Sequence, residues 1–263
     1  MDIRLDLRKS LQENAAEYFE KAKKSKNKMQ GAKTAIAQAQ IQAQKQQERH
    51  EQVKQKIQLQ QPKEHWYHKY HWSKTTNGHL MVAGQNASAN EKLIKAHTEP
   101  SDIVFHTDMA GSPFTILKAG GEHTQQDLDE AAQLTAAYSK AWQNNLASLE
   151  VFYVKPEQVT KEAQSGEYLT KGSFMIRGET NYINATVQLC IGVITQEGYH
   201  PQIFAGTQES AKKHCSSYAQ IRPGDNKTSD VAKQLQQRFS GDLDTYVKML
   251  PAGGTTIAQI HNG

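Results

Sequence analysis

The sequence contains little cysteine and no long apolar run, and both shortages narrow the class of protein. Only two of its 263 residues are cysteines, Cys190 and Cys215, which is too few for a disulfide framework or a cysteine-based zinc site. No stretch approaches the roughly 18 consecutive apolar residues of a membrane helix. The charged N-terminus is not typical of a secretory signal. These absences predict a soluble, cytoplasmic protein without membrane contact.

Hydrophobic residues are also scarce, at 37% of the chain with a mean hydropathy of −0.74. Average globular domains contain roughly 45–50%. Residues 1–64 hold 14 Lys+Arg against 8 Asp+Glu, whereas the other 199 residues hold 17 against 19. The net charge of +4 is therefore the sum of +6 and −2, and the positive charge belongs to the N-terminal quarter. We predict an arm over residues 1–62 and a separate domain over residues 63–263.

Proline is absent before Pro62, and Gly31 is the only glycine in that stretch, which favours one long helix. Ser10 and Glu13 have the spacing of a capping box. Steps of four and three from residue 11 to residue 57 give fourteen positions, of which eleven are apolar or aromatic. This pattern predicts a helix over about residues 10–61, roughly 75 Å long, with a coiled-coil seam that requires a partner helix. The seam includes Leu11, Ala15, Tyr18, Met29, Ile36, Val53 and Ile57.

Six lysines between residues 21 and 33 form a basic stretch on this helix, and residues 38–61 contain eleven glutamines. The lysines fit a solvated helix face, and they also fit sequence-independent contact with phosphates. The glutamines are more typical of a polar helix surface than of an aggregating tract, because alanine and charged residues interrupt them.

From His65 onward the chain becomes dense in aromatic and apolar residues, in short runs typical of strands. The runs come in groups and do not alternate strictly with helices, which predicts an α+β fold with a mixed or antiparallel sheet and packed helices. The expected strands cover residues 80–83, 103–106, 114–117, 151–154, 174–176 and 187–194, with a short last strand after 251–254. The expected helices cover residues 127–147, 208–219 and 229–239.

Histidines recur at every third position from His65 to His71, a spacing that suggests a metal site. No neighbouring carboxylate or cysteine completes a zinc ligand set. Aromatic residues alternate with these histidines, so we favour packing of the aromatic rings with the histidines at the surface. We expect no metal and no cofactor.

His106 and Asp108 stand where an expected strand enters a loop containing Gly111, a position that suits functional polar groups. The pair could act in acid–base chemistry, and an enzyme acting on RNA would need a closed pocket around it. The sequence contains no Gly-x-Ser-x-Gly, Walker or dinucleotide motif. We therefore expect no enzymatic activity and no catalytic residue.

Lys161 and Arg177 lie close to glycine-containing turns. A cation next to glycine lets a charge and the backbone approach an anion together. From spacing alone, a salt bridge to a nearby carboxylate fits each residue equally well.

Several short blocks, in order along roughly residues 10–194, resemble the NFACT family of ribosome-rescue factors, namely its RNA-binding domain (NFACT-R) and the coiled-coil arm that precedes it. The blocks are Asn14-Ala15-x-x-Tyr18-Phe19, Trp66-Tyr67-x-Lys69-Tyr70-x-Trp72, Asp102-Ile103-Val104-Phe105-His106-x-Asp108, Ser139-Lys140-Ala141-Trp142, Pro156-Glu157-Gln158-Val159-Thr160-Lys161 and Gly178-Glu179-Thr180-Asn181-Tyr182.

This resemblance implies a non-enzymatic RNA-binding module. Family members bind the large ribosomal subunit that still carries a peptidyl-tRNA, and they help recruit tRNA for C-terminal tailing of the stalled chain. The expected partners are therefore ribosomal RNA of the large subunit and tRNA. The family's polar motif positions fall on four residues that we expect to contact RNA, together with Lys69: Lys161 and Arg177 at phosphates, His106 through a hydrogen bond, and Asp108 orienting it.

The sequence departs from the family in two ways. Gly84-Gln85-Asn86-Ala87 stands where the family usually has Gly-Arg-Asp-Ala, so two charges are replaced by two amides. Either an internal polar contact is kept in neutral form, or an RNA contact is weakened. The family's N-terminal domain and first arm helix would precede Met1. If Met1 is the true start, we expect a separately encoded NFACT N-terminal domain protein or a second copy of this chain to supply the helix that covers the seam. A coiled-coil scaffold that binds protein and not RNA is the alternative.

Overall fold

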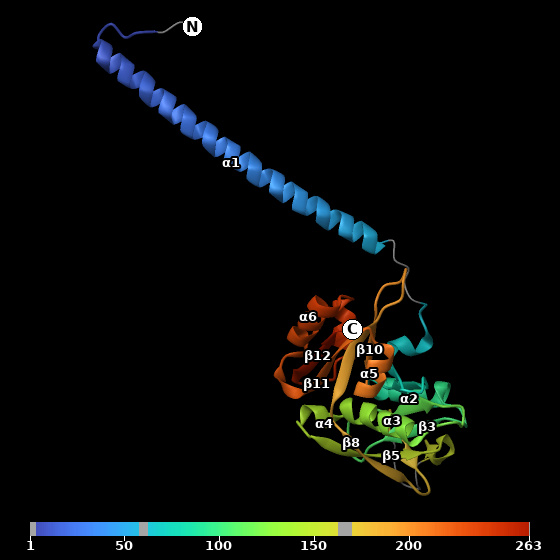
Figure 1. Ribbon diagram of the computed structural model, residues 1–263. Helices are drawn as coiled ribbons and strands as arrows, with labels where there is room; N and C mark the ends of the chain where they lie inside the picture. The colour runs from blue at the N-terminus through green and yellow to red at the C-terminus, as the bar shows by residue number, and fades with distance from the viewer. Residues whose placement is uncertain (1–3, 58–62, 163–169, 263) are drawn as a thin grey trace. The chain divides into compact units, whose positions relative to one another are not determined.

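The computed structural model describes residues 4–57, 63–162 and 170–262, with the side chains of residues 47–57 left out. The chain forms two compact units, residues 1–59 and residues 60–263 (Figure 1). No helix in the described ranges is long and apolar enough to cross a membrane.

The first unit is built on one helix, α1 (Leu11–Ile57). Its predicted capping box is confirmed: the Ser10 amide donates to Glu13 Oε2 at 2.8 Å, and the Glu13 amide donates to Ser10 Oγ at 3.2 Å. The two bonds satisfy amides that the first turn of a helix leaves without a partner, and they fix where the helix begins. Residues 58–61 of the predicted helix lie outside the described residues.

The apolar seam of α1 is exposed. Leu11 is 76% exposed, Met29 54% and Ile36 59%, and Ala15 is exposed as well. Tyr18 is 41% exposed, although its hydroxyl donates to the Arg4 carbonyl at 2.8 Å. The seam residues Val53 and Ile57 belong to the helix by their backbone, but their side chains lie outside the described residues. Over its described side chains, the apolar stripe of α1 is thus open to solvent, and the sequence predicts a partner helix for it.

The second unit contains two larger sheets in which every pairing is antiparallel, which confirms the α+β fold. The six-stranded sheet has the order β1 (His71–Lys74), β2 (Leu80–Ala83), β4 (Thr115–Lys118), β3 (Ile103–His106), β5 (Ser148–Val154), β8 (Asn181–Thr186). The four-stranded sheet has the order β10 (Gln202–Gly206), β9 (Leu189–Ile194), β11 (Ser217–Asn226), β12 (Thr255–Asn262). A short pair joins β6 (Val159–Thr160) to β7 (Met175–Ile176).

The described residues of this unit include six α-helices: α2 (Ala87–His97), α3 (Gln125–Ala137), α4 (Lys140–Gln143), α5 (Gln208–His214), α6 (Thr228–Phe239) and α7 (Leu243–Met249). They also include two short 3₁₀ helices, η1 (Trp66–Lys69) and η2 (Pro156–Gln158).

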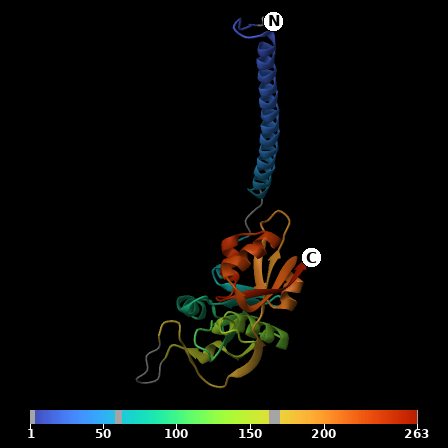
Figure 2. The same cartoon turned by 90° about the vertical axis from the view of Figure 1, so that its left-hand side faces the viewer.

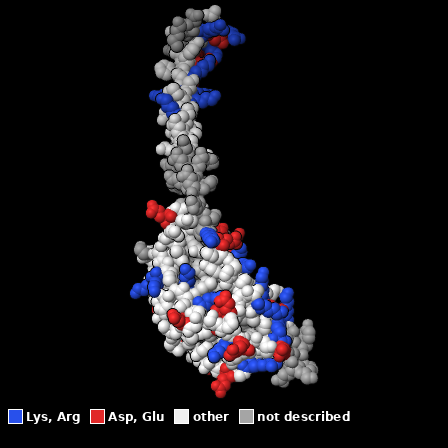
Figure 3. Space-filling model, turned by 90° about the vertical axis from the view of Figure 1, so that its right-hand side faces the viewer, with Lys and Arg blue, Asp and Glu red and all other residues white. Residues whose placement is uncertain are grey.

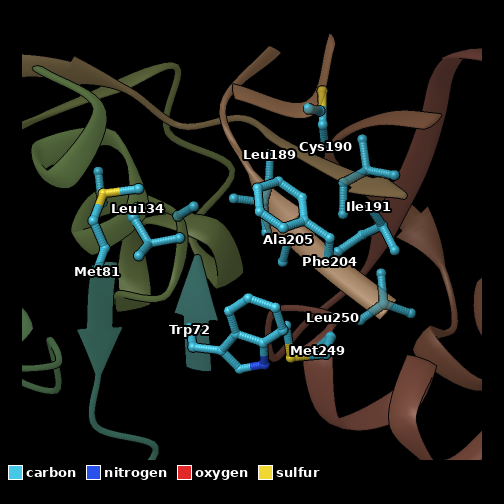
Figure 4. Close-up of a cluster of buried hydrophobic side chains, with 14 of the residues drawn as sticks. Trp72, Met81, Leu134, Leu189, Cys190, Ile191, Phe204, Ala205, Met249 and Leu250 are labelled. Atoms are coloured by element: carbon cyan, nitrogen blue, oxygen red, sulfur yellow. The ribbon is translucent and has the colours of Figure 1, made fainter. Parts of the chain in front are cut away.

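One large core joins the two sheets. Figures 1 and 2 show α3 between the six-stranded sheet and the orange and red segments of the second sheet. Trp72 of β1 and Phe204 of β10 meet edge to face at 6.0 Å, and both side chains are buried. Figure 4 shows Met81 and Leu134 on one side and Leu189 and Phe204 on the other, with Trp72 below and between them. The sheets and α3 therefore form a single packed body.

The opposite face of the six-stranded sheet is covered by α2 and by the β6–β7 pair. Alternation along each strand decides which side chains point there, because successive residues face opposite sides. Val82 and Ile116 pack under Leu93 of α2. Val104 and Phe152 pack under the segment that contains Phe174. This second, smaller layer forms the candidate site described below.

Most predicted strands are confirmed, but two predicted helices are wrong in part. The helix predicted over 127–147 ends at Ala137, because Ser139 caps a new short helix, its side chain accepting from the Ala141 amide at 3.1 Å. The helix predicted over 208–219 ends at His214, and β11 begins at Ser217. The strands β1, β8, β10 and β11 and the helices α2 and α7 were not predicted from the sequence.

The predicted surface position of the histidines is wrong for His71. It lies on β1, where its ring stacks against Tyr138 at 3.8 Å, and its Nδ1 is buried without a hydrogen-bond partner in the described part of the chain. Burial lowers the pKa of His71 to about 3, so the ring is neutral at physiological pH. The aromatic neighbours do pack as predicted, with Tyr70 and Trp72 buried.

Candidate functional site

A cavity of about 530 Å³ lies at the end of the six-stranded sheet, where β2 and β3 finish and β4 begins. Its lining comes from three stretches far apart in sequence, within residues 84–90, 106–114 and 171–176, together with Tyr138 and Phe152. All of them belong to the second unit.

The first wall is the start of α2. Asn86 is its N-cap, with its Oδ1 accepting from the Ala89 amide at 2.9 Å. One turn later, buried Asn90 accepts from the Phe114 amide at 3.1 Å and so links α2 to β4. Gly84 is required beneath it, because a Cβ there would lie 2.0 Å from Asn90 Oδ1. The Asn86 amide thus has a structural partner, whereas Gln85 is exposed at the cavity and has no hydrogen bond to any described residue.

The second wall is the end of β3. The His106 ring stacks on Phe114 at 4.1 Å and lies 5.9 Å from Phe152. Burial lowers the pKa of His106, and this effect exceeds the opposing effects of backbone hydrogen bonds with Thr107 and Ser112 and of the Asp108 charge. His106 is therefore a neutral imidazole near pH 7. Asp108 is exposed, and no hydrogen bond joins it to His106 within the described ranges.

The third wall is the turn before β7, which lies directly on the first turn of α2. Gly172 has a φ of +82°, and a Cβ there would lie 2.6 Å from Ala87 Cα. Both features favour glycine, since other residues are strained at this φ and have no room. The Gly172 amide also donates to Glu91 Oε2 at 3.3 Å.

Lys161 and Glu91 fasten this turn from outside the cavity. Lys161 Nζ lies 4.7 Å from the centre of the Phe174 ring, donates to the Thr170 carbonyl at 3.3 Å and stands 3.5 Å from Glu91 Oε2. Glu91 also accepts from Lys95 Nζ at 2.7 Å. The hydrogen bonds from Lys95 and Gly172 hold the pKa of Glu91 at about 2, so the carboxylate is charged.

Arg177 and Lys69 lie apart from the cavity lining. Arg177 is 59% exposed on its side chain and stands 3.5 Å from Glu162 Oε2. Lys69 is exposed on η1, near His97 at the other end of α2. Burial is the main cause that lowers the pKa of His97, and the charge of Lys69 lowers it further. His106 and Asp108 thus both line the cavity, Lys161 contacts the lining residue Phe174 from outside it, and Arg177 and Lys69 lie apart from the lining.

The salt bridges that the sequence left open for Lys161 and Arg177 are both present. The pair of Arg177 with Glu162 is exposed, and such pairs contribute about 0–1 kcal/mol, so it does not exclude anion binding. The pair of Lys161 with Glu91 is partly buried, with side chains 27% and 23% exposed. Figure 3 shows Lys and Arg mixed with Asp and Glu over one face of the domain, in agreement with its near-neutral charge.

Four features of this site are not indicated by the sequence: the lack of a hydrogen-bond partner for Gln85 among the described residues, Lys171 and Phe174 in the lining, and the contacts of Glu91 with Gly172, Lys95 and Lys161. Only the glycines at 84 and 172 could have indicated a close approach of the backbone, and sequence does not show what approaches them.

No group of three or more His, Cys, Asp or Glu side chains in the described ranges could hold a metal ion. The rings of His65 and His68 lie 5.4 Å apart, while His71 stacks on Tyr138. The chemistry that the site offers consists of aromatic faces, amides and a neutral imidazole inside, with cations at its edge.

Residues 69–178 match the family model described as NFACT protein RNA binding domain. The chain is 35% identical over 213 residues to the archaeal Rqc2 homolog aRqcH of Methanocaldococcus jannaschii, which is 79% of this chain and 31% of that protein. It is 32% identical over 177 residues to the ribosome quality control complex subunit NEMF of Homo sapiens, which is 65% of this chain and 16% of that protein. The solved C-terminal part of the fibronectin/fibrinogen-binding protein from Streptococcus suis aligns at 20% identity with a TM-score of 0.40 over 48% of each chain, too remote to support an argument.

The match over residues 69–178 places an NFACT RNA-binding domain within the antiparallel α+β unit. The chain belongs to the NFACT family, as the resemblance of its sequence blocks predicts. It spans less than a third of the length of the two curated relatives described above.

Proposed function

We propose that this chain is the RNA-binding module of a ribosome quality control factor. It would bind the obstructed large ribosomal subunit or its tRNA and support C-terminal tailing of stalled nascent chains. The proposal rests mainly on where the cavity lies relative to the family match. Every residue lining the cavity, and also Lys161 and Arg177, falls within residues 69–178, which match the RNA-binding family model. The names of the relatives, which refer to ribosome quality control, support the choice of pathway.

The local charges support RNA as the ligand. Phosphates bind exposed cations with little dependence on sequence. Lys161 and Arg177 flank the β6–β7 pair and hold salt bridges that an arriving phosphate can replace. The module would act without catalysis, since His106 has no hydrogen-bonded nucleophile in the part of the chain that the structure describes.

A salt titration of RNA binding tests the proposal on the full chain. Each phosphate contact contributes a slope of about −0.9 for duplex or −0.7 for single-stranded nucleic acid in a plot of log affinity against log salt. We expect Lys161→Ala and Arg177→Ala each to weaken binding and to reduce the slope by about one contact. Lys233→Ala is the matched control, because Lys233 is exposed on α6 and has no ion pair to any described residue. Equal affinities and slopes in all three variants would refute the assignment of these cations.

A second candidate function rests on the exposed seam of α1. The arm would pair with a helix of a separately encoded NFACT N-terminal domain protein, or with a second copy of this chain, and the whole could act as a protein-binding scaffold. Sedimentation of the purified chain distinguishes these two partners, because self-pairing gives a dimer, whereas a chain that pairs only with another protein remains a monomer. Partner binding that does not respond to salt, together with no RNA binding, would favour the scaffold.

A further inference from the structure

The cavity has the size of a site for one small group. Its volume of about 530 Å³ lies within the roughly 300–1,000 Å³ of ordinary ligand sites. An RNA duplex does not enter such a site, because proteins contact A-form helices across the minor groove and along the phosphates. A single base that has left its stack does fit this description.

The walls offer ring faces for stacking. Phe114 and Phe152 close the inner side and are almost fully buried, whereas His106 and Phe174 are only half-buried at the cavity. Phe114 holds His106 by stacking at 4.1 Å and Phe174 edge to face at 5.2 Å. Aromatic faces held in place by packing are the usual platforms for unpaired bases.

The polar groups suit a base edge better than a phosphate. The Gln85 amide has no partner among the described residues, the Asn86 amide nitrogen remains available because its cap uses only Oδ1, and Asp108 is an exposed acceptor. Amides and carboxylates are the groups that pair with base edges. The charged residues of the lining are Asp108 and Lys171, which cancel, while Lys161 and Arg177 stand outside it.

We propose that the cavity receives one unpaired RNA base, flipped out of its strand, while the flanking phosphates lie against Lys161 and Arg177 beside the β6–β7 pair. This inference rests on the proposed RNA-binding function and adds the class of ligand. The domain would then recognise bulges, loops or ends of a structured RNA and would discriminate against continuous duplex.

The test compares three RNA hairpins that differ at one position: fully paired, with a single bulged adenosine, and with an abasic bulge that keeps the backbone and lacks the base. We expect the bulged adenosine to bind the full chain about 5- to 150-fold more tightly than the abasic bulge, which corresponds to about 1–3 kcal/mol for one stacked base. Equal affinities for the bulged adenosine and the abasic bulge would overturn the inference and leave RNA binding intact. Binding to none of the three would instead overturn the proposed function.

A cavity-filling variant provides the second arm. Ala110 is exposed on the loop after β3 and lines the cavity, so Ala110→Trp places a ring inside it. We expect this variant to lose the preference for the bulged base and to keep the affinity for the abasic hairpin, which also shows that it is folded. Ala258→Trp, at an exposed position of β12, is the matched control and should keep the preference. A preference retained by Ala110→Trp would overturn the inference.

Discussion

The turn at Gly172 provides the sharpest test of how the site is built, because the chain contains a matched control for it. Gly172 and Gly198 have nearly the same φ, +82° and +80°. A Cβ at Gly172 would lie 2.6–2.7 Å from Ala87 Cα, Cβ and carbonyl oxygen, whereas a Cβ at Gly198 would have nothing within 4 Å. Alanine at either position therefore introduces the same backbone strain, and only Gly172→Ala adds a clash.

The expected magnitudes follow from these two effects. Alanine at positive φ costs about 1–2 kcal/mol in the left-handed region, and this cost applies to both variants. Overpacking against the backbone of α2 adds about 1–3 kcal/mol to Gly172→Ala. The turn can relieve the clash by moving away from Ala87, but it then loses the hydrogen bond from the Gly172 amide to Glu91. Either response displaces the third wall of the cavity.

Urea unfolding and RNA binding measured on both variants separate the effects. We expect the free energy of unfolding to fall further in Gly172→Ala than in Gly198→Ala by about 1–3 kcal/mol, with about 2–4 °C in Tm for each kcal/mol in a domain of this size. We expect the affinity for the bulged-adenosine hairpin to fall only in Gly172→Ala. Equal stability and equal RNA affinity in the two variants would show that the turn does not depend on its contact with α2.

Two further predictions concern His71 and Asp108. Burial lowers the pKa of His71 to about 3, so below pH 6.5 the unfolded chain takes up a proton that the folded chain does not. As the pH falls from about 6.5 to 3, the free energy of unfolding should therefore decrease by up to about 1.4 kcal/mol for each pH unit. His71→Phe keeps the stack on Tyr138 and should flatten this dependence; a pH profile identical to that of the unmodified chain would contradict the assignment. Asp108→Asn should weaken the bulged-cytidine hairpin more than the bulged-uridine hairpin, since a carboxylate accepts from the amino group of cytosine; an equal effect on both would show that Asp108 does not contact the base.

The arm and most strands could be predicted because their determinants are local. The Ser10–Glu13 capping box, the absence of proline and the seam spacing define α1 without reference to any other segment. The strand predicted over 103–106 is likewise a short apolar run with its polar residue at the end. Such features act within one or two turns or along a single strand, so sequence patterns contain them.

Tertiary contacts explain the errors. The segment after His214 was expected to continue a helix, yet it pairs with β9 and β12 on both sides, and those partners are distant in sequence. The strand β11 even contains Pro223, which is tolerated because the register shifts between Pro223 and Asn226. The sequence pattern does not indicate helix α2, because few of its residues pack on the sheet, namely Ala89, Leu93 and Ile94.

The candidate site could be predicted only in pieces, for the same reason. His106 and Asp108 were expected to lie at a strand end, and Lys161 beside a turn, but no pattern connects them across more than fifty residues. They are connected by the packing of Gly172 against Ala87 and by the contacts of Glu91 with Gly172 and Lys161. These contacts form only when the turn before β7 lies against the start of α2. Sequence shows which residues are unusual, and packing decides which of them meet.

The charge of the domain determines how it can bind RNA. Residues 65–263 hold 17 cationic against 19 anionic residues, so the domain lacks the general attraction of a basic protein for phosphates. Glu91 and Glu162 also compensate Lys161 and Arg177 in the free protein, so each phosphate must displace a carboxylate before it gains a contact. Under the proposed function, such phosphate contacts add little affinity for an arbitrary duplex, and a group that fits a shaped site would have to add the rest. The cavity lined by rings and amides, with Lys161 against its Phe174, would provide that site for the unpaired base that we propose.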